Sequence, residues 1–294
     1  MSFRLAGFAD EAANDLEDQI RVLKENHIDL LEIRGINGKN VDELSSSEAN
    51  TIRKRLDAEG ISVWSIGSPF GKIGIGEEFS PHLESFKHSL ELADILGAAH
   101  FRIFSFFGAT DSAPVLERLG QFIDAARNSD VILCHENEKD IYGETAENCL
   151  EIHRTFPTLR AVFDPANYIQ CGQDTVVAWT KLSPYVEYMH IKDALPDGSV
   201  VPTGKGIGRL PYLLSHYKGQ VLTVEPHLSV FEGFDRLEKE QKTKMHFCYP
   251  DPKTAFTAAV DALRETLGRI EEWRKSDSGS SEWEIWEAAT SEAS

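Results

Sequence analysis

Short apolar runs alternate with amphipathic stretches along the whole chain. Between the runs, apolar residues recur at helical spacing, as Leu16, Ile20 and Leu23 do, which is typical of an amphipathic helix. The runs themselves have the length of buried strands. They predict eight strands, at residues 3–9, 29–35, 61–67, 99–107, 130–137, 159–165, 186–194 and 220–227.

Eight strands that alternate with helices favour parallel pairing through right-handed crossovers, and eight such units in 294 residues fit a closed (β/α)8 barrel. An open doubly wound sheet would need a phosphate-binding glycine loop after its first strand, and residues 7–15 (GFADEAAND) do not provide one. Residues 203–208 (TGKGIG) lack the GKS or GKT ending of a nucleotide loop, so we interpret them as a glycine-rich loop at the barrel mouth. We therefore expect an α/β fold, a (β/α)8 TIM barrel, with one domain over residues 1–275.

Two segments lie outside the repeating pattern. Residues 226–251 make a long connection after the eighth predicted strand, and such connections are often lids or binding loops. Residues 276–294 form an acidic, serine-rich tail without a basic residue. Its large apolar residues Trp283, Ile285 and Trp286 suggest docking on the barrel or on a second subunit, and a loosely held C-terminus is the alternative.

The chain carries 48 Asp and Glu residues against 30 Lys and Arg residues, a formal net charge of -18. A surface of this charge repels phosphate backbones, and no run of Lys or Arg offers a basic groove, so we expect no nucleic-acid partner. The four cysteines have no CxxC spacing and are interpreted as reduced thiols. Because no signal-peptide pattern is visible and no apolar run reaches the roughly 18 residues of a membrane helix, we expect a cytoplasmic protein without a membrane partner.

Four polar residues end the last four predicted strands, and we call them the strand-end set: Glu136, Asp164, His190 and Glu225. The separations, from 136 to 164, 164 to 190 and 190 to 225, are 28, 26 and 35 residues, each close to one strand–helix unit. Because the carboxyl ends of barrel strands meet at one mouth, these side chains should converge there. Three converging carboxylates would raise each other's pKa, and a divalent cation removes that penalty.

Each member of the strand-end set has a simpler interpretation when it is taken alone. A single strand-end Asp or Glu is more often a helix cap or an ion-pair partner, and a single His is more often structural. The matched positions on four consecutive units favour a shared metal site instead. Three carboxylates and one imidazole suit one moderately hard divalent cation, with Mn²⁺ as our first choice and Mg²⁺, Co²⁺ or Zn²⁺ as the other candidates.

Alternation along the strands selects further residues that face the same mouth. Lys192 lies two residues after His190 and is our first candidate for contact with a substrate oxygen, with a structural ion pair as the alternative. Arg102 is a candidate for binding an anionic or polyhydroxyl substrate. His227 shares the parity of Glu225 and could reach the same site.

Glu32 and Arg34 share one face of the second predicted strand. Charged residues inside an apolar barrel strand are costly unless they are paired, so these two are candidates either for a buried mutual pair or for substrate binding. Aromatic residues near other strand ends, Phe8, Trp64 and Phe70, could form an apolar wall for a sugar, with core packing as the alternative.

In its residue types, order and spacing, the strand-end set resembles the metal ligands of the xylose isomerase-like superfamily of (β/α)8 barrels, in the group of sugar phosphate isomerases and epimerases. HIKD at residues 190–193 and FDPAN at residues 163–167 are similar to recurrent motifs of that family, and the resemblance covers about residues 3–274. Ketose 3-epimerases of the family often carry a histidine three residues after the metal-binding aspartate. Here Asn167 stands at that position, where we expect it to contact the substrate.

The resemblance implies a metal-dependent isomerase or epimerase that acts on a small carbohydrate, a ketose or a sugar phosphate. The cation would hold two vicinal oxygens of the ketose and polarise its carbonyl. Glu136 and Glu225 would serve both as ligands and as acid–base groups on opposite faces of the sugar, through a metal-stabilised enediolate. Homo-oligomers are common in this family, so the resemblance is compatible with one here.

Three alternatives stay open. A dehydratase or lyase would use the same enolate to expel a β-substituent from a keto sugar or keto glycoside. An abasic-site endonuclease, a more remote alternative, would need a basic groove and more strand-end histidines than this chain has. The third alternative is a barrel that binds a sugar or a partner chain without catalysis.

Overall fold

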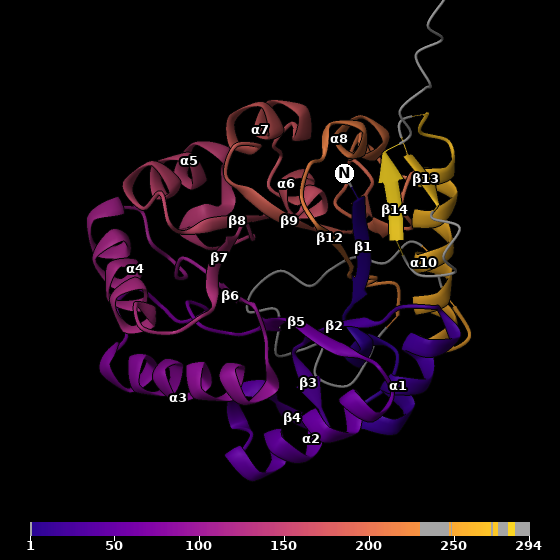
Figure 1. Ribbon diagram of the computed structural model, residues 1–294. Helices are drawn as coiled ribbons and strands as arrows, with labels where there is room; N and C mark the ends of the chain where they lie inside the picture. Colours follow the sequence, from indigo (N-terminus) through magenta and orange to yellow (C-terminus); the bar gives the residue numbers. More distant parts are fainter. Residues whose placement is uncertain (1, 230–246, 248, 272, 276–281, 286–294) are drawn as a thin grey trace, which may run out of the picture.

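The computed structural model describes residues 2–229, 247, 249–271, 273–275 and 282–285. Eight parallel strands form a ring in the order β12-β9-β8-β7-β6-β5-β2-β1, and pairing of β1 with β12 closes it (Figure 1). The strands are β1 (Ser2–Gly7), β2 (Leu30–Ile33), β5 (Ser62–Gly67), β6 (His100–Ile103), β7 (Ile132–Glu136), β8 (Arg160–Phe163), β9 (Val186–Ile191) and β12 (Val221–Val224). The predicted closed barrel is confirmed.

Helices surround the ring of strands (Figure 1). Acidic side chains cap several of them: Asp15 accepts a backbone hydrogen bond at the start of α1, and Asp174 does so at the start of α7. The helices are α1 (Leu16–Glu25), α2 (Ser46–Ala58), α3 (Ser80–Leu96), α4 (Ser112–Ala126), α5 (Ala146–Thr155), α6 (Pro165–Gln170), α7 (Thr175–Leu182), α8 (Leu210–His216) and α10 (Pro252–Gly268).

Alternate strand residues face the inside and the outside of the barrel, which gives it two apolar cores. The larger core lies between the strands and the helices. The lumen is filled by Ala6, Leu30, Cys134, Val162, Tyr188 and Val221, with Trp64 packed against them. Residues two positions apart on a strand face the same side, so the polar residues that follow two positions after several of these also face the lumen. They lie closer to the C-terminal ends of the strands and therefore gather at the C-terminal mouth.

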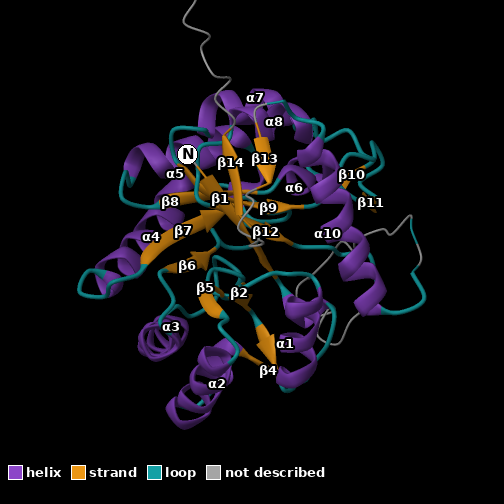
Figure 2. Ribbon diagram, turned by 45° about the vertical axis from the view of Figure 1, so that its right-hand side comes forward, coloured by secondary structure: helices purple, strands orange, loops and turns teal. Residues whose placement is uncertain are grey.

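The C-terminal part of the chain adds two antiparallel strands to the sheet (Figure 2). β13 (Trp273–Lys275) pairs with β14 (Glu282–Ile285), and β14 pairs with the first half of β1. Trp283 is buried and stacks on Phe3, with ring centroids 6.5 Å apart. Trp283 therefore docks on the barrel, whereas Trp286 lies outside the described residues.

Two short hairpins follow barrel strands at the C-terminal mouth. β3 (Gly35–Ile36) pairs with β4 (Lys39–Asn40), and β10 (Asp193–Ala194) pairs with β11 (Val200–Val201). Most of the predicted long connection after β12 lies outside the described residues. Within the described part, no helix has the length and apolar character needed to cross a membrane. Cys134, Cys149 and Cys171 are free thiols.

Candidate metal centre

The strand-end set meets at the C-terminal mouth of the barrel. Glu136 ends β7 and His190 lies in β9, while Asp164 and Glu225 directly follow β8 and β12. One ligand atom from each residue lies within 4.8 Å of the ligand atoms of the others, and all four side chains are buried. A single cation could therefore contact all four.

His190 presents its two ring nitrogens to different partners. Nδ1 lies 2.9 Å from Glu136 Oε1 and 3.4 Å from Glu225 Oε2. Nε2 lies 3.1 Å from Glu32 Oε2, and Tyr188 donates its hydroxyl to Glu32 Oε1 at 2.8 Å. A histidine that donates its Nε2–H to a carboxylate keeps the Nδ1 lone pair available for a metal ion.

With no cation bound, the surrounding carboxylates favour the protonated form of His190. Burial alone would lower the pKa of His190, but Glu136, Glu32 and Glu225 raise it well above its ordinary value of 6.5. Burial alone would likewise raise the pKa of Glu32, and the charge of His190 lowers it instead. A divalent cation would therefore compete with a proton at His190.

Within the described residues, only one side-chain oxygen of Asp164 accepts a hydrogen bond. It caps α6, and its Oδ1 accepts the backbone N–H of Asn167 at 3.0 Å. Its buried Oδ2 has no hydrogen-bond partner among the described residues and lies 3.0 Å from Lys192 Nζ. Burial raises the pKa of Asp164 to about 7, although Lys192 opposes the rise. An oxygen in this situation suits a metal ligand.

Glu136 is anchored from two sides. Arg102 donates from Nη1 to Glu136 Oε2 at 2.8 Å. Asn167 donates from Nδ2 to Glu136 Oε1 at 3.4 Å and to the carbonyl oxygen of Asn137 at 2.9 Å. Arg102 and Asn167, both selected from the sequence, therefore contact the same carboxylate.

Glu225 is surrounded by the other selected residues. Lys192 Nζ donates to Glu225 Oε2 at 2.9 Å, and Arg34 Nη1 donates to Glu225 Oε1 at 3.2 Å. His227 Nε2 lies 3.5 Å from Glu225 Oε1. Burial alone would raise the pKa of Glu225, but Lys192 and His227 lower it well below its ordinary value. This carboxylate is therefore held in its charged form.

Two acidic residues that the sequence analysis did not select complete the mouth. Asp10 and Glu11 lie in the short 3₁₀ helix η1 (Ala9–Glu11), directly after β1. Arg34 donates to Asp10 Oδ2 at 2.7 Å and to Glu11 Oε1 at 3.1 Å. The backbone N–H of His227 donates to Glu11 Oε2 at 2.7 Å, and burial raises the pKa of Glu11 to about 8 although Arg34 opposes the rise. Their position directly after a strand is the sequence signal that could have selected them.

The interpretation of Glu32 and Arg34 as a mutual pair is wrong. Glu32 lies in β2, whereas Arg34 directly follows the strand, so they lie at different depths in the barrel and meet different neighbours. Glu32 is fully buried beside His190 and Tyr188, whereas Arg34 lies nearer the mouth and contacts η1.

Of the three aromatic residues near strand ends, Phe8 alone lies at the strand-end set. Its ring centroid is 5.1 Å from that of His190. Trp64 packs against the lumen cluster and stacks on His100 at 4.1 Å. Phe70 belongs to the outer core between strands and helices. Of the two interpretations, core packing is therefore confirmed for Trp64 and Phe70, and the aromatic wall is wrong for both.

The glycine-rich loop at residues 203–208 encloses a side chain of the protein itself. The carboxylate of Asp193 accepts the backbone N–H groups of Gly204, Gly206 and Gly208 at 3.0, 3.0 and 2.9 Å. These N–H groups are therefore used inside the protein and do not offer a cradle for an outside phosphate. The interpretation as a loop at the barrel mouth fits this arrangement.

Buried carboxylates outnumber permanently charged cations around the strand-end set of the described barrel. The carboxylates are Asp10, Glu11, Glu32, Glu136, Asp164 and Glu225, and the cations are Arg34, Arg102 and Lys192. Six acids against three bases leave an excess of acidic groups, which protons on Glu11, Asp164 and His190 relieve when no cation is bound. Together with the oxygen-rich donor set and its single imidazole, this excess fits a divalent cation.

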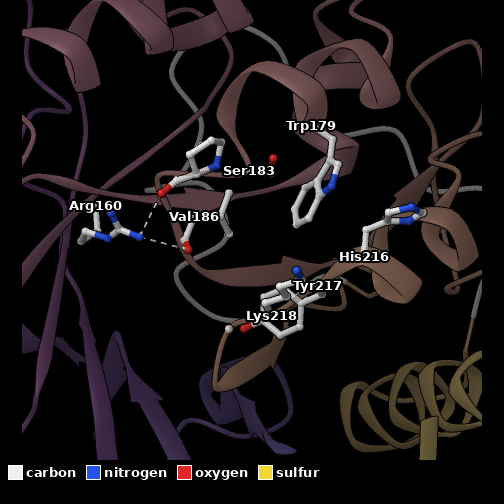
Figure 3. Close-up of a pocket in the computed structure, with 9 residues that line it drawn as sticks. Arg160, Trp179, Ser183, Val186, His216, Tyr217 and Lys218 are labelled. Carbon is white, nitrogen blue, oxygen red and sulfur yellow. Dashed lines mark hydrogen bonds between the residues drawn. The ribbon is translucent and has the colours of Figure 1, made fainter. Parts of the chain in front are cut away.

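A separate pocket of about 500 Å³ opens at the other end of the barrel (Figure 3). Arg160 and Val186, the first residues of β8 and β9, line it together with Trp179 and Tyr217. Arg160 donates to the carbonyl oxygens of Pro184 and Val186 at 3.4 and 3.5 Å. No residue of the strand-end set lines this pocket. Because barrels of this kind carry their chemistry at the C-terminal ends of the strands, we do not assign a reaction to it.

Solved structures share this fold at low sequence identity. A D-tagatose 3-epimerase-like protein has a TM-score of 0.70 at 15% identity, over 92% of this chain and 99% of that chain. The probable 3-DHS dehydratase AsbF from Bacillus anthracis has a TM-score of 0.69 at 14% identity, over 89% and 98%. The IOLI protein with a bound zinc atom has a TM-score of 0.69 at 14% identity, over 91% and 99%. At these identities the likeness shows the fold alone.

The family of the chain follows from its sequence. No curated protein sequence matches it at a significant level. A family model described as xylose isomerase-like TIM barrel matches residues 20–235, a range that contains the whole strand-end set and well over half of the 294 residues. The chain therefore belongs to the xylose isomerase-like TIM barrel family.

Proposed function

We propose that the protein is a divalent-metal-dependent isomerase or epimerase that acts on a ketose or a sugar phosphate. One observation carries the proposal: the ligand atoms of the strand-end set lie within 4.8 Å of one another at the C-terminal mouth. The set combines three carboxylates with an imidazole, where enzymes of this fold carry their chemistry. The fold shared with a D-tagatose 3-epimerase-like protein is in keeping with this reaction class.

Glu136, Asp164, His190 through Nδ1, and Glu225 would hold one cation. Mn²⁺ is our first choice, with Mg²⁺, Co²⁺ or Zn²⁺ as the other candidates, and the zinc atom of the IOLI structure shows that this fold can accept a metal. When bound, the cation would polarise the carbonyl of a ketose whose vicinal oxygens it holds. Glu32 would orient His190 for this role rather than contact the substrate, since it is fully buried beside the imidazole.

Glu136 and Glu225 would move the proton. In the barrel order β7-β8-β9-β12 they occupy the two ends of the row formed by the strand-end set, so they can reach a bound sugar from opposite sides. One of them removes the proton next to the carbonyl, which leaves an enediolate. Return of a proton by the other on the opposite face is epimerisation, and return to the neighbouring carbon is isomerisation.

The remaining polar groups of the mouth would contact the sugar. They are Lys192, Arg102, Asn167, His227 and Arg34, all buried and all within 3.5 Å of Glu136 or Glu225. Donors so close to the acid–base carboxylates are well placed for substrate oxygens that gain negative charge during the reaction. We keep the cytoplasmic location, the homo-oligomer and the absence of a nucleic-acid partner as proposals from the sequence and its net charge of -18.

The position of Lys192 favours a second candidate, a dehydratase or lyase. Its Nζ lies 2.9 Å from Glu225 Oε2, so an ammonium group stands beside a proposed base. Such an acid can protonate a departing hydroxyl on the side from which the base takes its proton. The probable dehydratase that shares the fold makes this outcome worth measuring. No comparable observation favours an abasic-site endonuclease.

Proton exchange in D₂O tests the proposal. The Mn²⁺-loaded protein is incubated with ketoses, sugar phosphates and keto glycosides, and deuterium incorporation next to the carbonyl is followed together with release of water or aglycone. We expect exchange with at least one of these substrates, and a loss of about 10²-fold or more in Glu136→Gln and Glu225→Gln. Glu187→Gln serves as the matched control, because Glu187 pairs with His100 and Arg160 away from the strand-end set.

Exchange without release of a group would support isomerisation or epimerisation, and release would support elimination. If a protein that retains its cation shows neither exchange nor release, the isomerase or epimerase and the dehydratase or lyase are both contradicted.

A further inference from the structure

A cavity of about 30 Å³ lies at the barrel mouth, where β2, β5 and β6 end. Its lining residues are Arg34, Asn40, Gly67, Ser68, Pro69, Lys72, Arg102 and Phe104. Three of them are cationic and none is acidic, in a chain whose net charge is -18. A pocket lined by one sign of charge attracts a ligand group of the other sign.

Arg102 has a hydrogen-bond donor that the described protein leaves unused. The residue is 4% exposed, and its Nη1 donates to Glu136. Its buried Nε has no hydrogen-bond partner among the described residues. The guanidinium carbon lies 4.3 Å from the ring centroid of Phe104, which fixes the group at the cavity wall. A buried N–H of this kind is costly unless a ligand accepts its hydrogen bond.

The acids that neutralise these cations are not part of the cavity lining. Glu136 pairs with Arg102 at 2.8 Å, and Glu138 pairs with Lys72 at 3.0 Å. Arg34 pairs with the acids of η1 and with Glu225, as described above. None of these carboxylates lines the cavity, so every charged group that lines it is positive.

The cavity has the size of a single carboxylate group. A water molecule needs about 10–15 Å³, so this space holds about two oxygen-sized groups. A Cβ at Gly67 would lie 2.6 Å from the ring of Phe8, 3.1 Å from Arg102 Nη2 and 3.2 Å from Arg34 Cβ, so only glycine fits at this point of the cavity wall. A planar carboxylate matches the plane of a guanidinium and suits this volume better than a phosphate with its three terminal oxygens.

We propose that this cavity binds the carboxylate of an acidic keto sugar, so that the substrate is a keto sugar acid rather than a neutral ketose or a sugar phosphate. The inference deepens the proposed function and rests on it. Arg102 connects the cavity to Glu136, and Arg34 connects it to Glu225. A substrate whose carboxylate meets these arginines has its neighbouring carbons beside both proposed acid–base groups.

Four ketoses that differ in their end groups provide the test: D-fructose, 2-keto-D-gluconate, D-fructuronate and D-fructose 6-phosphate. Each is titrated calorimetrically into the Mn²⁺-loaded protein. We expect at least one carboxylate ketose to bind about tenfold or more tightly than D-fructose, the gain of a charge-assisted hydrogen bond. Lys72→Met should remove most of this preference and Lys72→Arg should retain it. Lys205→Met, at an exposed position outside the cavity, should leave it unchanged.

Three results would overturn the inference: equal binding of D-fructose and both carboxylate ketoses, tightest binding of the phosphate, or an undiminished carboxylate preference in Lys72→Met. The last would place the carboxylate on the cation instead. The proposed function can fail separately. Absence of proton exchange together with a Lys72-dependent carboxylate preference would contradict the reaction and leave the subsite. Exchange on D-fructose without that preference would support the reaction and contradict the subsite.

Discussion

His190 Nε2 lies 3.1 Å from Glu32 Oε2, and both side chains are fully buried. Tyr188 holds the second oxygen of Glu32 through its hydroxyl at 2.8 Å. This arrangement fixes the imidazole ring and turns Nδ1 toward Glu136 and Glu225. A carboxylate so placed also makes the imidazole a stronger metal ligand. Glu32 is therefore better understood as a positioning residue than as a substrate contact.

Replacement of Glu32 should weaken metal binding without unfolding the barrel. We expect Glu32→Gln to lower the affinity for Mn²⁺ about 10- to 100-fold, because a neutral amide no longer supports the imidazole. Tyr188→Phe, which keeps the carboxylate and removes one hydrogen bond, should cost less than about tenfold. Calorimetric titration with Mn²⁺ measures both. Wild-type affinity in a folded Glu32→Gln protein would rule out the positioning role.

Metal affinity should rise with pH. Burial raises the pKa of Asp164 to about 7, and neighbouring carboxylates raise that of His190, so both hold protons that a cation must displace. We expect the Mn²⁺ dissociation constant to fall about tenfold per pH unit for each displaced proton between pH 5 and 7. Titrations at several pH values, in buffers that bind Mn²⁺ only weakly, measure how the dissociation constant changes with pH. An affinity independent of pH in this window would show that neither group binds the ion.

The same pKa shift has a consequence for the metal-free protein. Asp164 has an ordinary pKa of 3.8 and a raised one of about 7 when folded, so the folded state binds more protons than the unfolded state in this window. Its contribution to the free energy of unfolding therefore falls as pH rises from about 4 to 7. Added Mn²⁺ should accordingly raise the melting temperature more at pH 7.5 than at pH 5.5. Equal increments at both values would contradict the assignment.

Removal of the Lys192 ammonium should separate metal binding from turnover. Its Nζ lies 3.0 Å from Asp164 Oδ2 and 2.9 Å from Glu225 Oε2, close to where the cation would bind. Lys192→Met removes a competing positive charge, so we expect Mn²⁺ to bind at least as tightly as in the wild type. Turnover should fall about 10²-fold, because the substrate loses a donor or acid. Loss of the metal in this variant would instead make Lys192 part of the support of the site.

Asp193 should be a stabilising residue of the mouth. Its carboxylate accepts the N–H groups of Ala194, Gly204, Gly206 and Gly208, and it is 1% exposed. Asp193→Ala leaves these donors without their acceptor and should lower the free energy of unfolding by about 3 kcal/mol or more. Asp193→Asn keeps one accepting oxygen, so its free energy of unfolding should lie between those of the wild type and Asp193→Ala. Urea unfolding measures the change, and a loss below about 0.5 kcal/mol would refute this role.

The fold could be predicted from the sequence because each barrel strand is a short apolar run with clear ends. β7 (Ile132–Glu136) and β8 (Arg160–Phe163) lie inside the predicted runs 130–137 and 159–165. The same regularity located the strand-end set, since a polar residue after an apolar strand stands at the barrel mouth.

The partners of individual side chains were harder to predict. Alternation shows which face a residue occupies but not which neighbour it meets across the barrel, and the partner of Glu32, Tyr188, lies 156 positions away. Asp10 and Glu11 were missed because they lie in a 3₁₀ helix, where strand alternation no longer applies. Likewise, nothing in TGKGIG indicates that Asp193, 11 to 15 positions earlier, fills the loop.

The most direct test of the account is the metal content of the purified protein and of two variants of the strand-end set. Wild type, Asp164→Asn, His190→Ala and the control Glu187→Gln are equilibrated with Mn²⁺, freed of excess ion and analysed by mass spectrometry. We predict about one ion per chain in the wild type and in Glu187→Gln, and less than about a tenth of that in the other two. A full complement of metal in folded Asp164→Asn and His190→Ala would show that these side chains do not share a cation.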